Sequence, residues 1–190
     1  MVMTHWMRTM HDAILIGIGT ALNDDPQLNT RHLPALPSGE QRRLPRPVVL
    51  DSKLRFKPDC KLLKNFREGT GRRPWIITSR GSFDPLKHRE LANAGARVFI
   101  TDSVDGSLSV DSILFTLRQQ GIRSVMVEGG AQIINSFLRA KVAHSLVITV
   151  APTLVGKEGV SYDAEATKKF EYLSTEKEGR DTVVVFTSAK

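Results

Sequence analysis

Residues 12–31 read DAILIGIGTALNDDPQLNTR, and this stretch decides the fold. The run 13–18 is apolar and unbroken, which is typical of a strand buried on both faces of a parallel sheet. It is followed by Gly19, by the hydroxyl residue Thr20 and by a predicted turn over 23–26. Ligands of open α/β sheets bind outside the carboxyl ends of the strands. We therefore expect a binding site here, although a Gly-x-Gly-Thr segment is also common in plain turns.

Two later segments have the same form, an apolar strand that ends in polar or small residues. PVVLDS at 47–52 is predicted as a strand ending in an acid and a hydroxyl group. VMVEGGA at 125–131 predicts another strand end, and a helix is predicted directly after it over 132–140. A glycine pair between a strand and a helix bares backbone N–H groups to an anion such as a phosphate. An ordinary glycine-rich turn is the alternative.

The rest of the chain predicts an α/β fold with a mixed, mainly parallel sheet. The other predicted helices cover 4–11, 84–94 and 110–120, and the other strands cover 75–78, 97–101, 146–150 and 182–187. A helical turn and a loop are predicted over 57–73. Loops, turns and polar connections are predicted over 32–47, 102–109, 152–159 and 160–181. No long helix separates the last two strands, so we expect them to pair antiparallel.

Length and composition favour one soluble domain over 1–190. The chain has 190 residues, of which 41% are hydrophobic, enough to bury a proper core. Cys60 is the single cysteine, which excludes an internal disulfide framework and favours a reducing compartment, so we expect a cytoplasmic protein. The histidines are scattered, and we expect no metal site. No apolar run approaches the roughly 20 residues of a membrane helix, so no membrane partner is expected.

The charge of the chain points to an anionic partner. The formal net charge is +7, with a pI near 9.8. Nucleic acid is one candidate, but the basic residues are mostly dispersed and only 6% of residues are aromatic and able to stack on bases. We therefore favour a phosphorylated small molecule or cofactor over nucleic acid.

Taken together, these segments resemble the riboflavin-biosynthesis reductases, most closely their stand-alone fungal form. The resemblance rests on Met7-Arg8, on 12–31, on PVVLDS, on VMVEGGAQIINSFL at 125–138 and on VAPTLVG at 150–156, all in family order. It implies a dihydrofolate reductase-like, three-layer α/β/α fold and a homodimer. It also implies NADPH-dependent reduction of the ribosyl side chain of 2,5-diamino-6-ribosylamino-4(3H)-pyrimidinone 5′-phosphate.

The resemblance also implies which residues form the site. The implied cofactor-binding residues are Thr20, Asp24, Ser52, Gly129, Gly130, Ala131, Gln132 and Ile133. The implied substrate-binding residues are Arg8, Leu28, Arg31 and Glu128. Arginines suit a 5′-phosphate because they stay charged and bind it through two nitrogens. No general acid is assigned. Arg80, in the segment Thr-Ser-Arg-Gly, is a candidate for the 2′-phosphate of NADPH, and a plain turn is at least as good an interpretation of that segment.

One departure from the family pattern leaves a second function open. The family begins with a strand carrying a Ser-x-Asp-Gly-type segment upstream of the helix that holds Arg8, whereas this chain starts almost at that helix. We therefore expect the first family strand to be missing. The alternative to the reductase is a non-catalytic, truncated homologue that binds nucleotide or pairs with a full-length subunit.

Overall fold

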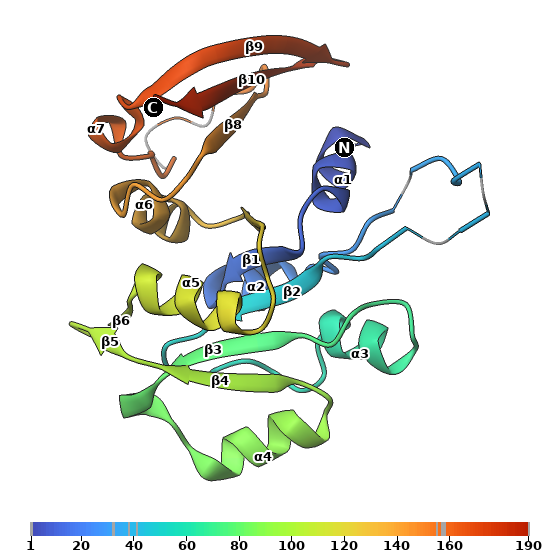
Figure 1. Cartoon of the computed structure of the whole chain (residues 1–190), viewed down its shortest axis with the longest axis vertical. Helices are drawn as coiled ribbons and strands as arrows, with labels where there is room; N and C mark the ends of the chain where they lie inside the picture. The colour runs from blue at the N-terminus through green and yellow to red at the C-terminus, as the bar shows by residue number, and fades with distance from the viewer. Residues whose placement is uncertain are drawn as a thin grey trace. The chain divides into compact units, whose positions relative to one another are not determined.

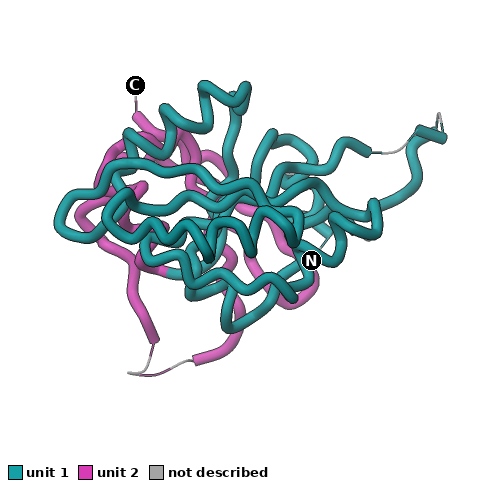
Figure 2. The backbone as a smooth tube through the Cα atoms, turned by 90° about the horizontal axis from the view of Figure 1, so that it is seen from below, with its two compact units in different colours: residues 1–130 teal, residues 131–190 magenta. Residues whose placement is uncertain are grey.

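The computed structural model describes residues 2–31, 33–37, 39–40, 42–154, 156 and 159–189. The chain forms two compact units, Met1–Gly130 and Ala131–Lys190, which Figure 2 colours teal and magenta. Within the described ranges, no helix is both long and apolar enough to cross a membrane. The predicted loop over 32–47 and turn over 152–159 include positions 32, 38, 41, 155, 157 and 158, which lie outside the described residues.

The first unit is built on a five-stranded parallel sheet with the strand order β4-β3-β2-β1-β7 (Figure 1). Its strands are β1 (Ala13–Gly17), β2 (Arg46–Leu50), β3 (Trp75–Ser79), β4 (Arg97–Thr101) and β7 (Val125–Val127). Parallel neighbours need crossover connections, and helices supply most of them. Because every strand of this sheet runs in the same direction, all five carboxyl ends meet at one edge.

The α-helices in the described part of this unit are α1 (Val2–Thr9), α2 (Ile18–Asp24), α3 (Lys61–Arg67), α4 (Pro85–Asn93) and α5 (Val110–Gln119). A 3-10 turn, η1 (Arg80–Ser82), and a small hairpin of β5 (Ser103–Val104) and β6 (Ser107–Leu108) complete it. The helix α4 starts where the sequence predicts, because the Asp84 carboxylate accepts a hydrogen bond from the Leu86 N–H at 2.8 Å and proline opens the helix.

The register of the sheet explains how its two faces are covered. Ile16, Val49 and Ile76 are paired neighbours on β1, β2 and β3, so their side chains point to one face, where they pack in one buried cluster with Leu63 of α3 and Leu91 of α4. Alternate residues point to the other face. Helix α5 contributes Ile113 and Leu117, which are buried but lie outside that cluster. Helices therefore cover both faces, as the predicted three-layer fold requires.

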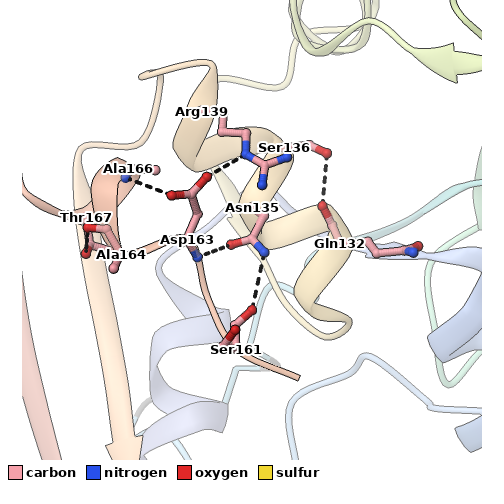
Figure 3. Close-up of polar contacts among 9 residues, drawn as sticks. All are labelled: Gln132, Asn135, Ser136, Arg139, Ser161, Asp163, Ala164, Ala166 and Thr167. Carbon is pink, nitrogen blue, oxygen red and sulfur yellow. Dashed lines mark hydrogen bonds and ion pairs between the residues drawn. The ribbon is translucent and has the colours of Figure 1, made fainter. Parts of the chain in front are cut away.

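The second unit contains a separate antiparallel sheet with the order β8-β10-β9. Its elements are α6 (Ala131–Arg139), β8 (Ser145–Val150), α7 (Ala164–Thr167), β9 (Phe170–Glu178) and β10 (Asp181–Ser188). The side chain of Asn135 on α6 fastens the segment before α7, since its Oδ1 accepts a hydrogen bond from the Asp163 N–H at 2.8 Å (Figure 3). Arg139 adds an ion pair to the Asp163 carboxylate, with Nε and Oδ2 2.6 Å apart.

The structure confirms the predicted α/β class and the antiparallel pairing of 146–150 with 182–187, and it corrects four details. The antiparallel strands form their own sheet instead of joining one mixed sheet. The polar connection predicted over 160–181 contains β9, whose side chains are mostly exposed and so lack apolar alternation. No helix is predicted between the strand over 13–18 and the turn over 23–26, but Ile18–Asp24 forms the short helix α2, anchored by the buried Ile18 and Ala21 three positions apart. The loop predicted over 102–109 contains the β5–β6 hairpin.

Candidate functional site

The predicted site segments of the first unit follow the carboxyl ends of neighbouring strands. Thr20 lies just after β1, Ser52 after β2, Arg80 after β3, and the segment 128–130 after β7. Since β2 and β7 both pair with β1, Ser52 and the 128–130 segment follow strands on either side of the one that precedes Thr20. This edge is where open α/β sheets bind ligands.

Thr20 packs directly against the two glycines that follow β7. A Cβ atom on Gly129 would lie 2.9 Å from both Cγ2 and Oγ1 of Thr20, closer than side chains can pack. A Cβ atom on Gly130 would lie 3.3 Å from the same Oγ1. Both glycines have positive φ angles, of 68° and 50°, a conformation that glycine adopts without strain. The turn is therefore fixed in shape, and its backbone is left uncovered by side chains of its own.

Arg8 and Glu128, two predicted substrate residues, are bound to each other. The Arg8 guanidinium donates from Nε to Oε1 at 2.8 Å and from Nη2 to Oε2 at 2.6 Å, while its Nη1 donates to the carbonyl oxygen of Asn29 at 3.1 Å. The side chains are only 13% and 17% exposed, so the pair is largely shielded from water. All three nitrogens of Arg8 are thus engaged, and α1 is fastened to the end of β7.

The segment after α2 carries the other two predicted substrate residues. Leu28 is 2% exposed and belongs to the core cluster, and its φ of 47° is unusual for a leucine. Arg31 is exposed, and its backbone N–H donates to Nδ1 of His5 on α1 at 3.2 Å. Its guanidinium has no hydrogen-bond or ion-pair partner in the part of the chain that the structure describes. Arg31 is the available cation, whereas Leu28 holds the segment in place.

The remaining predicted cofactor residues are less tightly arranged. Asp24 is the exposed last residue of α2, one turn after Thr20. Ser52 is half-buried, and its carbonyl oxygen accepts a hydrogen bond from the Ser79 hydroxyl at 2.8 Å, which joins the ends of β2 and β3. Ala131, Gln132 and Ile133 form the first turn of α6 in the second unit and follow Gly130 directly along the chain.

Two supporting residues were not predicted as part of the site. Asp51, beside Ser52, is fully buried, and its Oδ2 accepts a hydrogen bond from the Phe56 N–H at 2.7 Å. Burial raises the pKa of the Asp51 carboxyl above its usual range. Asn29 is the other, because its carbonyl oxygen holds Arg8. The sequence marks Asp51 as an acid at a strand end, but a backbone acceptor such as that of Asn29 gives no sequence signal.

Fold and site together define an α/β protein with a glycine turn at the carboxyl edge of its parallel sheet. A sequence profile described as the RibD C-terminal domain matches residues 2–184, and the chain belongs to this family. It is 36% identical over 188 residues to the 2,5-diamino-6-ribosylamino-4(3H)-pyrimidinone 5′-phosphate reductase of Candida glabrata, covering 96% of this chain and 75% of that protein. The reductase of the same name from Saccharomyces cerevisiae is 33% identical, with 96% and 72% covered.

Solved structures give the same result. The riboflavin biosynthesis reductase Rib7 of Saccharomyces cerevisiae superimposes with a TM-score of 0.78 and 27% identity, over 99% of this chain and 80% of that one. RibD of Acinetobacter baumannii, at 24% identity, shares the fold with a TM-score of 0.79 over 99% of this chain and 50% of its own. The predicted family and the predicted reductase-domain fold are confirmed, and the comparisons give no support to the non-catalytic alternative.

Proposed function

We propose that this chain reduces the ribosyl side chain of 2,5-diamino-6-ribosylamino-4(3H)-pyrimidinone 5′-phosphate to the ribityl form, with NADPH as the reductant. Two reductases that are 36% and 33% identical to it bear that substrate's name. The observation that carries the proposal is the contact between Thr20 and the Gly129–Gly130 turn at the carboxyl edge of the sheet. A rigid turn without side chains can approach a phosphate closely and offer it backbone N–H groups.

The residues present fit the cofactor. Gly129 and Gly130 supply the uncovered turn, Ala131, Gln132 and Ile133 continue it into α6, and Thr20 offers a hydroxyl group beside the turn. Ser52 and Asp24 add a hydroxyl and a carboxylate that can bind hydroxyl or amide groups of the nucleotide. When bound, the cofactor supplies the hydride that the reduction needs.

The two arginines of the substrate site have different tasks in this proposal. Arg31 binds the 5′-phosphate, because its guanidinium is exposed and unpaired within the described residues. Arg8 holds Glu128, and each carboxylate oxygen keeps a lone pair with which to accept a hydrogen bond from a ribose hydroxyl. Leu28 contributes through its backbone, since its side chain is buried in the core.

In this proposal the protein orients the substrate and the cofactor and keeps water away from the reacting imine. The ring-opened sugar has a C1=N imine. A bound cofactor would supply a hydride to C1, and a proton on the nitrogen would complete the ribityl amine. An imine hydrolyses in water, so a closed site protects it. A site that holds C1 at the correct distance and angle raises the rate, because the entropy of bringing the reactants together is lost on binding and not in the reaction step.

The further parts of the proposal concern the molecule as a whole. We propose that residues 1–190 act as one reductase domain, as a homodimer, in the cytoplasm. Light scattering coupled to size exclusion measures the mass directly, and a mass of one chain at working concentration contradicts the homodimer.

The test of the function is an assay of the purified chain with the pyrimidine substrate. We expect NADPH to be consumed only when the purified chain and the pyrimidine substrate are both present. Mass spectrometry should show that the product has a ribityl chain. NADPH at 100 times its Kd should also stabilise the chain by about 2.7 kcal/mol. Binding of NADPH without turnover would favour the non-catalytic homologue, and neither binding nor turnover would contradict both interpretations.

A further inference from the structure

Arginines are concentrated where β2, β3 and β4 begin. Arg46 is the first residue of β2, Arg97 is the first residue of β4, and Arg72 and Arg73 come shortly before β3. Because these strands are parallel neighbours, their amino ends meet at one edge of the sheet. The candidate cofactor residues of the same unit follow the opposite, carboxyl ends. These arginines, which we name the arginine cluster, have no part in the site proposed above.

Aromatic rings hold two members of the arginine cluster. The register pairs Trp75 with Arg97 on one side and with Val48 on the other. Arg46 is two positions before Val48 on the same strand, so its side chain points to the same face. The Cζ atom of Arg46 lies 4.8 Å from the centroid of the Trp75 ring, and that of Arg97 lies 5.8 Å from it and 4.7 Å from the centroid of the Phe99 ring. Such contacts stabilise a guanidinium group without neutralising it.

Backbone carbonyl groups, which have no net charge, accept the hydrogen bonds of the cluster. Arg46 donates from Nη1 to the carbonyl oxygen of Arg73 at 2.9 Å. Arg73 donates from Nε to the carbonyl oxygen of Gly95 at 3.0 Å and from Nη2 to that of Ala96 at 2.9 Å. Within the described ranges, no carboxylate forms an ion pair with a member of the cluster.

The positive charges of the cluster are therefore poorly compensated. Burial, followed by repulsion from the other three members of the cluster, lowers the pKa of Arg46 to about 10. The Nε atom of Arg46 is also buried without a hydrogen-bond partner among the described residues. Asp12 acts on the cluster through Arg72, but its carboxylate already pairs with Arg43, with Oδ1 and Nη2 3.1 Å apart. An anion bound at this edge would relieve the repulsion.

Several nitrogens of the cluster are left to bind an anion. Nη2 of Arg46, Nη1 of Arg73 and every side-chain nitrogen of Arg97 have no hydrogen-bond partner in the part of the chain that the structure describes. Arg73 and Arg97 are exposed. Guanidinium groups match the oxygens of phosphates, to which they donate in pairs.

The span of the cluster favours two linked phosphates over one. The strands β2 and β4 are separated by β3, which places them about 10 Å apart. A diphosphate with hydrogen bonds of about 2.9 Å on each side fits this span better than a single phosphate does. Nucleic acid fits less well, because Trp75 is only 5% exposed under the arginines and cannot stack on a base.

We propose that the arginine cluster is a second anion-binding site, which takes a diphosphate group and is separate from the cofactor and substrate sites. The bound anion compensates the like charges and links the starts of β2, β3 and β4, so it stabilises the first unit. The inference does not depend on the proposed reaction, because the two use different residues.

The test uses inorganic pyrophosphate as the probe, titrated by calorimetry into the purified chain at an ionic strength kept constant with chloride. Arg97→Gln is the informative variant, because Arg97 donates no side-chain hydrogen bond within the described residues and its loss keeps the carbonyl contacts of Arg46 and Arg73. It should weaken pyrophosphate binding by about tenfold or more. Arg89→Gln is the matched control, on the exposed surface of α4, and should leave the Kd unchanged.

Melting curves give a second measurement and show that the variants are folded. Pyrophosphate at ten times its Kd should raise the melting temperature of the unaltered chain by about 3–6 °C. Arg97→Gln at the same pyrophosphate concentration should gain much less. Phosphates also stabilise proteins generally by exclusion from their surface, so an equal gain in both chains overturns the site. Absence of binding at millimolar pyrophosphate overturns it too.

The remaining outcomes identify where else the probe binds. Binding that is weakened by Arg31→Gln and not by Arg97→Gln places pyrophosphate in the substrate site and overturns the proposal. Binding of single-stranded RNA that depends on Arg97 and is tighter than that of pyrophosphate also overturns it, in favour of nucleic acid. Arg97→Gln should keep the reductase activity of the unaltered chain, so failure of this site and failure of the proposed reaction can be told apart.

Discussion

The Arg8 guanidinium donates two parallel hydrogen bonds to the Glu128 carboxylate, at 2.8 and 2.6 Å, although the two residues are 120 positions apart in the chain. The pair joins the first helix to the last strand of the parallel sheet. Because the two charges neutralise each other, neither residue is well placed to bind a charged group of the substrate without its partner. The geometry favours Glu128 as an acceptor for sugar hydroxyls and Arg8 as the residue that orients it.

Arg8→Lys tests this division of labour. Lysine keeps the charge but cannot make the two parallel bonds or reach Asn29 at the same time. We expect the free energy of unfolding to fall by about 1.5–3 kcal/mol and kcat/KM for the pyrimidine to fall by about tenfold or more. The Kd of NADPH should not change. Arg89→Lys, on exposed α4, is the control; equal effects of the two substitutions would contradict a specific role for Arg8.

Gly129→Ala tests the contact with Thr20. The added methyl group would lie 2.9 Å from two Thr20 atoms and would occupy a positive φ. Gly121→Ala is the matched control, since Gly121 has a φ of 81° but open space around it. We expect the control to cost about 1–2 kcal/mol and Gly129→Ala to cost more and to weaken NADPH binding. Thr20→Ala should rescue part of the stability lost in Gly129→Ala, and a strictly additive double variant would count against the contact.

Asp12 gives the stability a defined pH dependence. Hydrogen bonds from the backbone N–H of Arg123, and then of Ser124, lower the pKa of the Asp12 carboxyl below 3.8. A pKa lowered by folding stabilises the protein above pH 3.8, and this stabilisation is lost as the pH falls through the folded-state value. Asp12→Asn should therefore destabilise the chain at neutral pH by about 1 kcal/mol.

The difference in free energy of unfolding between Asp12→Asn and the unaltered chain should become smaller as the pH falls. Urea unfolding at neutral pH and well below pH 3.8 measures it. Asp105→Asn, in the exposed β5–β6 turn, is the control and should leave the stability unchanged at both pH values. A constant difference between Asp12→Asn and the unaltered chain would show that the carboxylate charge does not contribute.

Asn135→Ala tests the clamp within the second unit (Figure 3). The side chain accepts from the Asp163 N–H at 2.8 Å and donates weakly to the Ser161 carbonyl at 3.5 Å. Its loss should lower stability by about 1 kcal/mol and speed hydrogen exchange at the Asp163 amide. Exchange at the β8–β10 amides should stay slow, and a uniform increase across the unit would mean that the clamp has no local role.

The sequence was sufficient where burial imposes a pattern on it. The strands that contain Ile16 and Val49 are buried on both faces, so unbroken apolar runs predict them. The sequence was insufficient for β9, which is held by backbone pairing with β10. Tyr172 and Leu173 of β9 are more than 60% exposed, and polar and apolar residues do not alternate along that strand. The Asp-Asp-Pro segment predicts a turn over 23–26, but the short helix α2 over Ile18–Asp24 was not predicted.

The contacts between the candidate site residues could not be predicted from the sequence. The resemblance names Thr20 and Gly129, yet only the fold shows that one packs on the other. It also names Arg8 and Glu128, whereas their pairing depends on α1 reaching the end of β7. Long-range pairs of this kind are set by topology, which a local pattern does not encode.

The central claim is that the nucleotide binds along the carboxyl edge of the parallel sheet. NMR of the isotope-labelled chain during titration with NADPH tests it most directly. We predict that the largest amide shifts fall on Thr20, Ser52, Gly129 and Gly130. Shifts confined to the opposite edge, at Arg46 and Arg97 where β2 and β4 begin, would contradict it.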